Sequence, residues 1–192
     1  MSIPPELPDP ADEQSPSGIE TPVRGHRRMR LLLIVAAVAL AVDVVTKVIV
    51  VATLTDQPPV RLLGGALYFS LARNSGAAFS LGTGMTVIFT VLAAVVVIVI
   101  IRTARKLYST AWAIALGLVL GGATGNLVDR IFRHPAPFRG AVIDFISVFD
   151  PYGRAFAIFN IADSCIVVGG VLAVFLAFTG RELDGTRTRK IS

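Results

Sequence analysis

Four long apolar stretches constrain this chain more than any other feature of its sequence. They cover residues 31–54, 85–101, 111–128 and 155–179, with few strongly polar residues among them. A helix rises ~1.5 Å per residue, so about 20 residues cross the ~30 Å hydrocarbon core of a bilayer. The charged fraction of 16% also lies below the roughly 25% of soluble domains. We therefore predict a mainly α membrane protein with four transmembrane helices, over approximately residues 31–54, 85–102, 109–130 and 158–179.

The basic residues predict how the helices are oriented. Clusters at residues 24–30, 102–106 and 181–190 flank the apolar stretches. By the positive-inside rule the first cluster lies in the cytoplasm, and four crossings return the C-terminus there. The net charge of +5 is explained by topology and lipid headgroups, because no aromatic-interleaved basic groove suggests nucleic acid. Six arginines on the outer side need a local reason, such as a site or contact with anionic lipid: Arg61, Arg73, Arg130, Arg133, Arg139 and Arg154.

The remaining segments predict one membrane domain with two tails. Residues 1–25 are rich in Pro, Glu, Asp and Ser, which is typical of a disordered tail. The apolar stretch that follows is too long for a signal peptide, so we expect a retained anchor. Residues 26–181 then form the transmembrane domain, and residues 182–192 form a second cytoplasmic tail. The outer segments, 55–84 and 131–157, are expected to build a small extracytoplasmic β-element, because residues 67–72 alternate like a strand after a Gly-Gly turn.

Two aspartates in the second half of the chain are the candidates for catalysis. Asp163 is expected about four residues inside the outer end of the fourth helix, and Asp144 on the loop before that helix. Facing carboxylates in a low-dielectric site share one proton, because both cannot ionise cheaply. Such a pair can deprotonate a water and protonate a leaving amine. The alternative is structural: Asp163 pairs with an arginine, and Asp144 is a solvated turn residue.

Several polar residues accompany this pair. Asn126, Asp129 and Arg130 share one face of the third helix, where Asp129 and Arg130 are expected to cap or pair and Asn126 to face a cavity. Asn160 lies one turn before Asp163 and is suited to orient an aspartate or to bind a substrate carbonyl.

Other positions favour structure over chemistry. Asp43 and Lys47, spaced i, i+4 in the first helix, are predicted to form a structural ion pair. Asn74 is suited either to bind substrate backbone or to form a turn. Cys165 has no plausible base, since His26 lies in the tail and His134 in a Pro-rich loop. No His/Cys cluster has zinc spacing, so we predict no metal and no cofactor.

Four motifs together resemble the lipoprotein signal peptidase family, also called signal peptidase II. They are residues 74–80 (NSGAAFS), 121–130 (GGATGNLVDR), 142–145 (VIDF) and 159–163 (FNIAD). The resemblance covers about residues 30–180. It implies a four-helix aspartic peptidase of the bacterial inner membrane with a small extracytoplasmic β-cradle. Such an enzyme removes the signal peptide from lipid-modified prolipoproteins by cleaving before the diacylglyceryl-cysteine.

The resemblance also implies roles for individual residues. Asp144 and Asp163 match the family's catalytic pair, and its polar site residues match Asn74, Asn126, Arg130 and Asn160. Asp43 and Lys47 match its Asp-x-x-Thr/Ser-Lys motif, although Val44 stands where the family commonly has Gln. Two other functions are kept open: a small ion-coupled transporter with Asp43, Asp129 and Asp163 as relay groups, and a membrane scaffold without activity.

Overall fold

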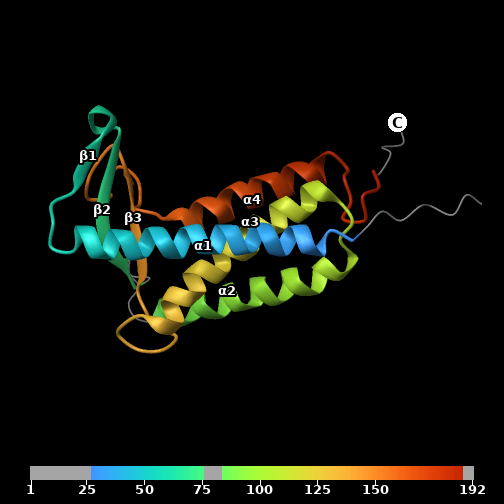
Figure 1. Ribbon diagram of the computed structural model, residues 1–192, viewed down its shortest axis with the longest axis horizontal. Helices are drawn as coiled ribbons and strands as arrows, with labels where there is room; N and C mark the ends of the chain where they lie inside the picture. The colour runs from blue at the N-terminus through green and yellow to red at the C-terminus, as the bar shows by residue number, and fades with distance from the viewer. Residues whose placement is uncertain (1–26, 76–83, 188–192) are drawn as a thin grey trace, which may run out of the picture.

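The computed structural model describes residues 27–75 and 84–187, which form four long helices and a three-stranded sheet (Figure 1). The predicted tail over residues 1–25 lies outside the described residues. In chain order the elements are α1 (Met29–Leu54), β1 (Val60–Leu62), the single 3₁₀ turn η2 (Leu63–Gly65), β2 (Leu67–Asn74), α2 (Gly84–Thr103), the 3₁₀ turn η4 (Ala104–Lys106), α3 (Thr110–Phe132), β3 (Val142–Val148) and α4 (Ile161–Phe178).

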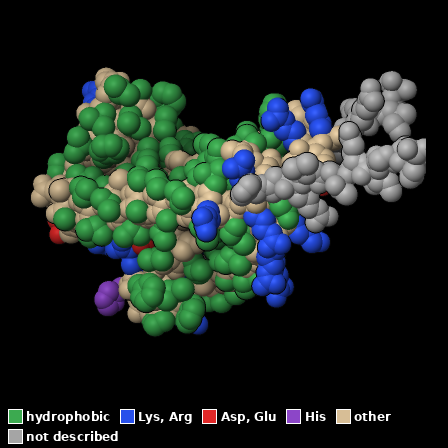
Figure 2. Space-filling view, turned by 45° about the vertical axis from the view of Figure 1, so that its right-hand side comes forward, with side chains coloured by type: hydrophobic (Ala, Val, Ile, Leu, Met, Phe, Trp, Pro, Cys, Tyr) green, Lys and Arg blue, Asp and Glu red, His purple; other side chains and the backbone are tan. Residues whose placement is uncertain are grey.

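The four helices are long and apolar enough to cross a membrane. In α1 one stripe is buried, and it consists of Leu32, Ala36, Ala39, Asp43, Lys47 and Val50. The other faces of α1 are apolar but exposed, as at Val38 and Val48, which are 59% and 57% exposed. A helix that is apolar all round needs lipid or protein on every side. Figure 2 shows hydrophobic side chains over most of the helical body. The predicted fold class is confirmed.

The fourth helix begins later than the sequence analysis placed it. We expected it from residue 158, whereas α4 begins at Ile161. The reason is local, since Asn160 is the N-cap and Phe159 pairs with Ile146 of β3 through backbone hydrogen bonds. Asp163 is therefore the third residue of the helix, and it lies in the first turn.

Helix α3 is the centre of the bundle and packs against α1, α2 and α4. Its Gly121-Gly122 pair makes this possible, because each glycine faces a different neighbour. A Cβ on Gly121 would lie 2.6 Å from the carbonyl oxygen of Ala36 in α1, and one on Gly122 would lie 2.4 Å from that of Ala162 in α4. Small residues let membrane helices approach this closely.

The three strands form an antiparallel sheet in the order β1-β2-β3. One face packs on the end of α1, where Ile143 and Phe145 of β3 join Val50 in a buried cluster. The register pairs Ala72 with Asp144, after an irregularity that follows Phe69. The sheet therefore holds Asp144 over the end of the helical bundle.

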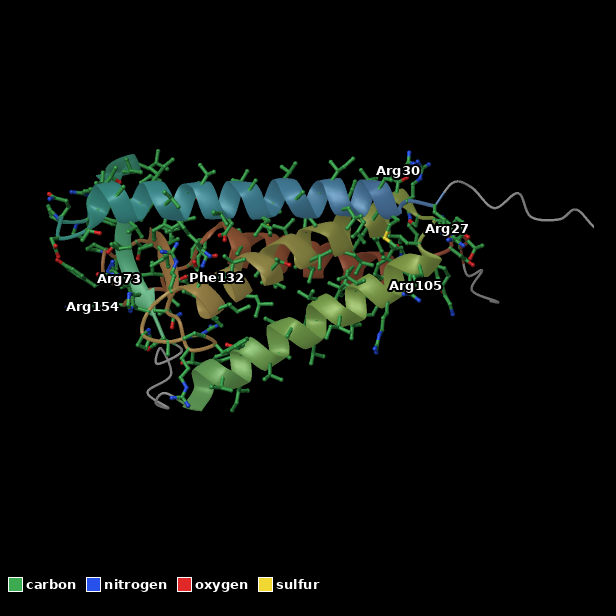
Figure 3. The ribbon with its side chains drawn as sticks, turned by 60° about the horizontal axis from the view of Figure 1, so that its bottom comes forward. Arg27, Arg30, Arg73, Arg105, Phe132 and Arg154 are labelled. Atoms are coloured by element: carbon green, nitrogen blue, oxygen red, sulfur yellow. The ribbon has the colours of Figure 1, made fainter. Side chains whose placement is uncertain are left out.

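The two ends of the bundle differ in charge and structure (Figure 3). Arg27, Arg30 and Arg105 lie at one end, which we call the basic end, and the strands with Arg73 and Arg154 lie at the other, which we call the sheet end. Part of the predicted C-terminal tail is ordered at the basic end. There the carbonyl oxygen of Leu183 accepts hydrogen bonds from the backbone N–H groups of Tyr108 and Ser109, at 2.8 and 3.1 Å.

Candidate active site

Asp144 lies in the middle of β3 and is 2% exposed, so it is not the solvated turn residue considered above. Both oxygens of its carboxyl group accept hydrogen bonds. The Asn74 amide at the end of β2 donates to Oδ2 at 3.0 Å, and the Asn160 amide donates to Oδ1 at 2.7 Å. Both donors are placed by the backbone, through the β2–β3 register and through the Phe159–Ile146 bridge.

Asp163 is fixed by the start of α4. The side chain of Asn160 accepts a hydrogen bond from the backbone N–H of Asp163 at 2.9 Å, while the Asp163 carboxylate accepts from the backbone N–H of Asn160 at 3.2 Å. This reciprocal arrangement is a capping box. The positive end of the helix dipole lies in this turn and favours negative charge there.

Two asparagines join the two aspartates. Asn160 is fully buried and caps Asp163 with its oxygen while its nitrogen donates to Asp144. Asn126 of α3 donates to Asp163 Oδ1 at 2.7 Å, and its oxygen accepts from Lys47 at 3.1 Å and from Asn160 at 3.3 Å. The structure thus brings together four residues within 37 positions of sequence, from α3, β3 and the start of α4, and Asn74 joins them from β2.

Burial and the neighbouring carboxylate set the protonation of Asp144. Removal from water raises its pKa from 3.8 to about 7, and the negative charge of Asp163 acts in the same direction. The amides of Asn74 and Asn160, and the more distant Lys47, oppose the rise in the pKa. Asp144 is therefore a carboxyl that holds a proton close to neutral pH, beside a second carboxyl.

A buried ionic network lies next to this site and contacts it through Lys47, which donates to Asn126. Lys47 is 1% exposed and lies 2.7 Å from Asp43 Oδ2 and 2.9 Å from Asp129 Oδ2, so the expected Asp43–Lys47 pair is present with a third partner. Asp43 also accepts from the backbone N–H of Ala162 at 2.9 Å, which ties α1 to the start of α4. The network therefore fixes the helix that carries Asp163.

Asp129 pairs at the end of α3, with Arg133 and Lys47. It also accepts from the backbone N–H of Ile143 at 3.2 Å, directly before Asp144. Arg130 is 8% exposed, lies over the Phe89 ring at 5.6 Å and interacts electrostatically with both candidate aspartates. Within the described residues its Nη1 has no hydrogen-bond partner.

Comparison with known proteins assigns the chain to a family. The sequence profile of Signal peptidase (SPase) II matches residues 35–179. The chain belongs to the signal peptidase II family. It is 55% identical over 163 residues to the lipoprotein signal peptidase of Streptomyces griseus, across 85% of this chain and 81% of that protein. It is 47% identical over 178 residues to the lipoprotein signal peptidase of Mycobacterium avium, across 92% of this chain and 95% of that protein.

The fold agrees with this membership. A solved bacterial membrane enzyme superposes with a TM-score of 0.69 at 27% identity, across 81% of this chain and 97% of that one. The four apolar helices and the family together make this signal peptidase II member a multi-pass bacterial membrane protein. The transporter alternative finds no support among these matches. Within the described residues no group of three or more His, Cys, Asp or Glu side chains is arranged to hold a metal.

Three contacts of this candidate site were not predicted from the sequence: the ion pair of Arg133, the helix cap made by Asn160 and the contact of Phe89 with Arg130. Arg133 follows Asp129 by four residues, so helical spacing could have found it. The Asn160 cap could have been read from an Asn three residues before an Asp, which is a capping-box pattern. Phe89 carried no signal, because α2 is uniformly apolar. Of the expected motif at residues 74–80, only Asn74 and Ser75 lie within the described residues.

Proposed function

We propose that this chain is an aspartic endopeptidase that removes the signal peptide from lipid-modified prolipoproteins, cleaving before the diacylglyceryl-cysteine, with Asp144 and Asp163 as its catalytic pair. One observation carries the proposal. Two carboxyls from separate elements are joined through the side chain of one fully buried asparagine, Asn160. A buried carboxylate pair of this kind can activate water without a nucleophilic side chain or a metal.

The different surroundings of the two carboxyls support different roles. Asp163 lies in the first turn of α4, where negative charge is favoured, and acts as the base that takes a proton from water. Asp144, with its pKa raised to about 7, begins protonated and donates its proton to the carbonyl oxygen as water attacks the carbonyl carbon. Asp163 then passes its proton to the amide nitrogen, the C–N bond breaks, and Asp144 regains a proton from the tetrahedral intermediate.

The surrounding polar groups are suited to hold the substrate and the two aspartates in place. Arg130 presents a buried Nη1 that has no partner within the described residues and is suited to donate to a substrate carbonyl. Asn126 is oriented by Lys47, which donates to its oxygen and leaves its nitrogen directed to Asp163. We therefore assign Arg130 to substrate binding, and Asn74, Asn126 and Asn160 to orientation of the pair.

The charge distribution supports an orientation for the chain. The basic end carries Arg27, Arg30 and Arg105, which the positive-inside rule assigns to the cytoplasm (Figure 3). On this reading both termini are cytoplasmic, and the carboxyl pair lies at the extracytoplasmic leaflet. A substrate anchored by its lipid in that leaflet would present its scissile bond at the depth of the pair.

Cleavage of a diacylglyceryl-modified prolipoprotein by the purified protein tests this proposal. Asp144→Asn and Asp163→Asn are each expected to abolish cleavage while the thermal unfolding midpoint remains measurable. Asp150→Asn is the matched control, because that carboxylate accepts backbone N–H groups of its own loop, from Tyr152 and Arg154. Parent-level cleavage by both site variants would refute the catalytic pair.

A further inference from the structure

A pocket at the sheet end is lined by residues other than Asp144 and Asp163. It has a volume of about 290 Å³ and is lined by Arg73, Phe132, Arg133, His134, Ala141 and Ile143. It lies between the end of α3 and the paired strands β2 and β3. Figure 2 shows Lys and Arg side chains close to the histidine at this end of the molecule. We propose that this pocket binds the phosphate-bearing headgroup of an anionic membrane phospholipid.

The charge of the pocket fits a phosphate group. Two guanidinium groups and an imidazole line it, and no acidic side chain is among its lining residues. Arg133 shares Asp129 with Lys47, which also pairs with Asp43, so two carboxylates balance the charges of Arg133 and Lys47. Arg73 is exposed and forms no ion pair within residues 27–75 and 84–187. Guanidinium groups bind phosphate through paired hydrogen bonds, which suits this arrangement.

The depth of the pocket favours a lipid over a free phosphate ion. The 23 residues of α3 span about 34 Å, slightly more than the ~30 Å hydrocarbon core, so the helix ends at headgroup level. Phe132, its last residue, lines the pocket and is 79% exposed. An exposed phenyl ring at this level is stabilised by contact with acyl chains, because apolar surface is unfavourable in water. A free phosphate ion has no apolar part for the phenyl ring to contact, whereas a phospholipid does.

The pocket is connected to the carboxyl pair through the backbone. Arg73 directly precedes Asn74, whose amide donates to Asp144, and the lining residue Ile143 directly precedes Asp144 itself. Arg73 and Ile143 are also register partners across β2 and β3. A bound headgroup would therefore hold together the two strands that aim Asn74 at Asp144. Any effect of lipid on cleavage rests on the proposed function, whereas lipid binding does not.

Thermal unfolding of the full-length protein in neutral detergent tests the binding site. Dioctanoyl phosphatidylglycerol is titrated, with dioctanoyl phosphatidylcholine and inorganic phosphate as parallel arms. We expect only phosphatidylglycerol to raise the unfolding midpoint. If phosphatidylcholine or inorganic phosphate gives the same shift in the parent protein, the site does not select an anionic lipid and the proposal is refuted.

Substitutions then locate the effect. Arg73→Gln should weaken the phosphatidylglycerol response about fivefold, which corresponds to about 1 kcal/mol for one basic residue near a membrane surface. Arg73→Lys should retain most of the response. Arg154→Gln is the matched control, because that arginine also lies at the sheet end but its guanidinium lies over the Tyr152 ring.

Two outcomes of this comparison would contradict the proposal. Equal responses of Arg73→Gln and Arg154→Gln would show that charge in the pocket is irrelevant. If Arg73→Lys weakens the phosphatidylglycerol response as much as Arg73→Gln does, the response depends on the structure of the strand and not on the positive charge at residue 73. Cleavage is measured in the same preparations, so that a missing lipid response with intact cleavage refutes the lipid site alone.

Discussion

Asn160 has two separable functions in this structure, and substitution can divide them. Its oxygen caps α4 by accepting from the backbone N–H of Asp163, and its nitrogen donates to Asp144 at 2.7 Å. Asn160→Ala removes both interactions. Asn160→Ser retains an N-cap oxygen but removes the amide donor. A comparison of the two variants therefore measures the contribution of each hydrogen bond.

The expected magnitudes follow from the burial of the site. Loss of an N-cap costs about 1 kcal/mol, and a buried acceptor left without its donor costs about 1–3 kcal/mol. Asn160→Ala should therefore lower the free energy of unfolding by about 2–4 kcal/mol, and Asn160→Ser by about 1 kcal/mol less. Both variants lose the group that positions Asp144. Displacement of a catalytic group by about 1 Å can cost ~100-fold in rate, so we expect a loss of cleavage of about 10- to 100-fold.

Detergent-induced unfolding and the pH dependence of cleavage are the assays. The Asn160 amide holds the pKa of Asp144 down, so its removal should raise that pKa further from about 7. The high-pH limb of the Asn160→Ser profile should then lie at higher pH than in the parent. Equal unfolding energies for the two variants would refute the capping function. A parent-like rate and pH profile in Asn160→Ser would refute the link to Asp144.

Three further predictions follow from the packing and the charges. A Cβ on Gly169 would lie 2.6 Å from the Ala115 carbonyl oxygen, whereas one on Gly170 would meet nothing within 4 Å. Gly169→Ala should therefore destabilise the protein by about 1–3 kcal/mol in thermal unfolding, while Gly170→Ala is neutral or slightly stabilising; equal effects would contradict the close helix contact. Lys47→Met leaves the buried Asp43 without its cation and Asp129 with Arg133 alone, and should cost about 3–5 kcal/mol in detergent-induced unfolding; parent-like stability would show that the network contributes little. Because the pKa of Asp144 is raised, its proton is held below about pH 7 and lost above it. The cleavage rate should decline as pH rises through about 7, whereas this group's contribution to folding stability should fall from about pH 4 and be lost by about pH 7; a cleavage rate that does not change from pH 5 to 9 would exclude Asp144 as the acid.

The sequence predicted the membrane architecture because that architecture follows from length and hydropathy. Each apolar stretch had to form a helix, since a chain in lipid must satisfy its backbone hydrogen bonds internally. The alternation near residue 70 likewise predicted β2. The position of Asp144 within a strand was harder to predict, because β3 pairs with β2 across about 70 positions of sequence.

The polar contacts of the site were predictable only where they were local. The Asp43–Lys47 pair follows from helical spacing, and the capping box at Asn160 follows from a pattern of four residues. The contacts of Lys47 with Asn126 and Asp129 could not be read from one sequence, because they depend on how closely α1 packs against α3. That approach is set by glycines whose neighbours are known only from the fold.

Infrared titration of the carboxyl groups tests most directly whether the pair shares one proton. The carbonyl stretch of a protonated carboxyl is followed from pH 4 to 9 in the parent and in Asp144→Asn, with Asp150→Asn as the control. We predict one buried carboxylic acid that loses its proton near pH 7 in the parent and in the control, and that is absent from Asp144→Asn. A parent protein in which both carboxyls are already ionised at pH 5, or a band that persists in Asp144→Asn, would contradict the account.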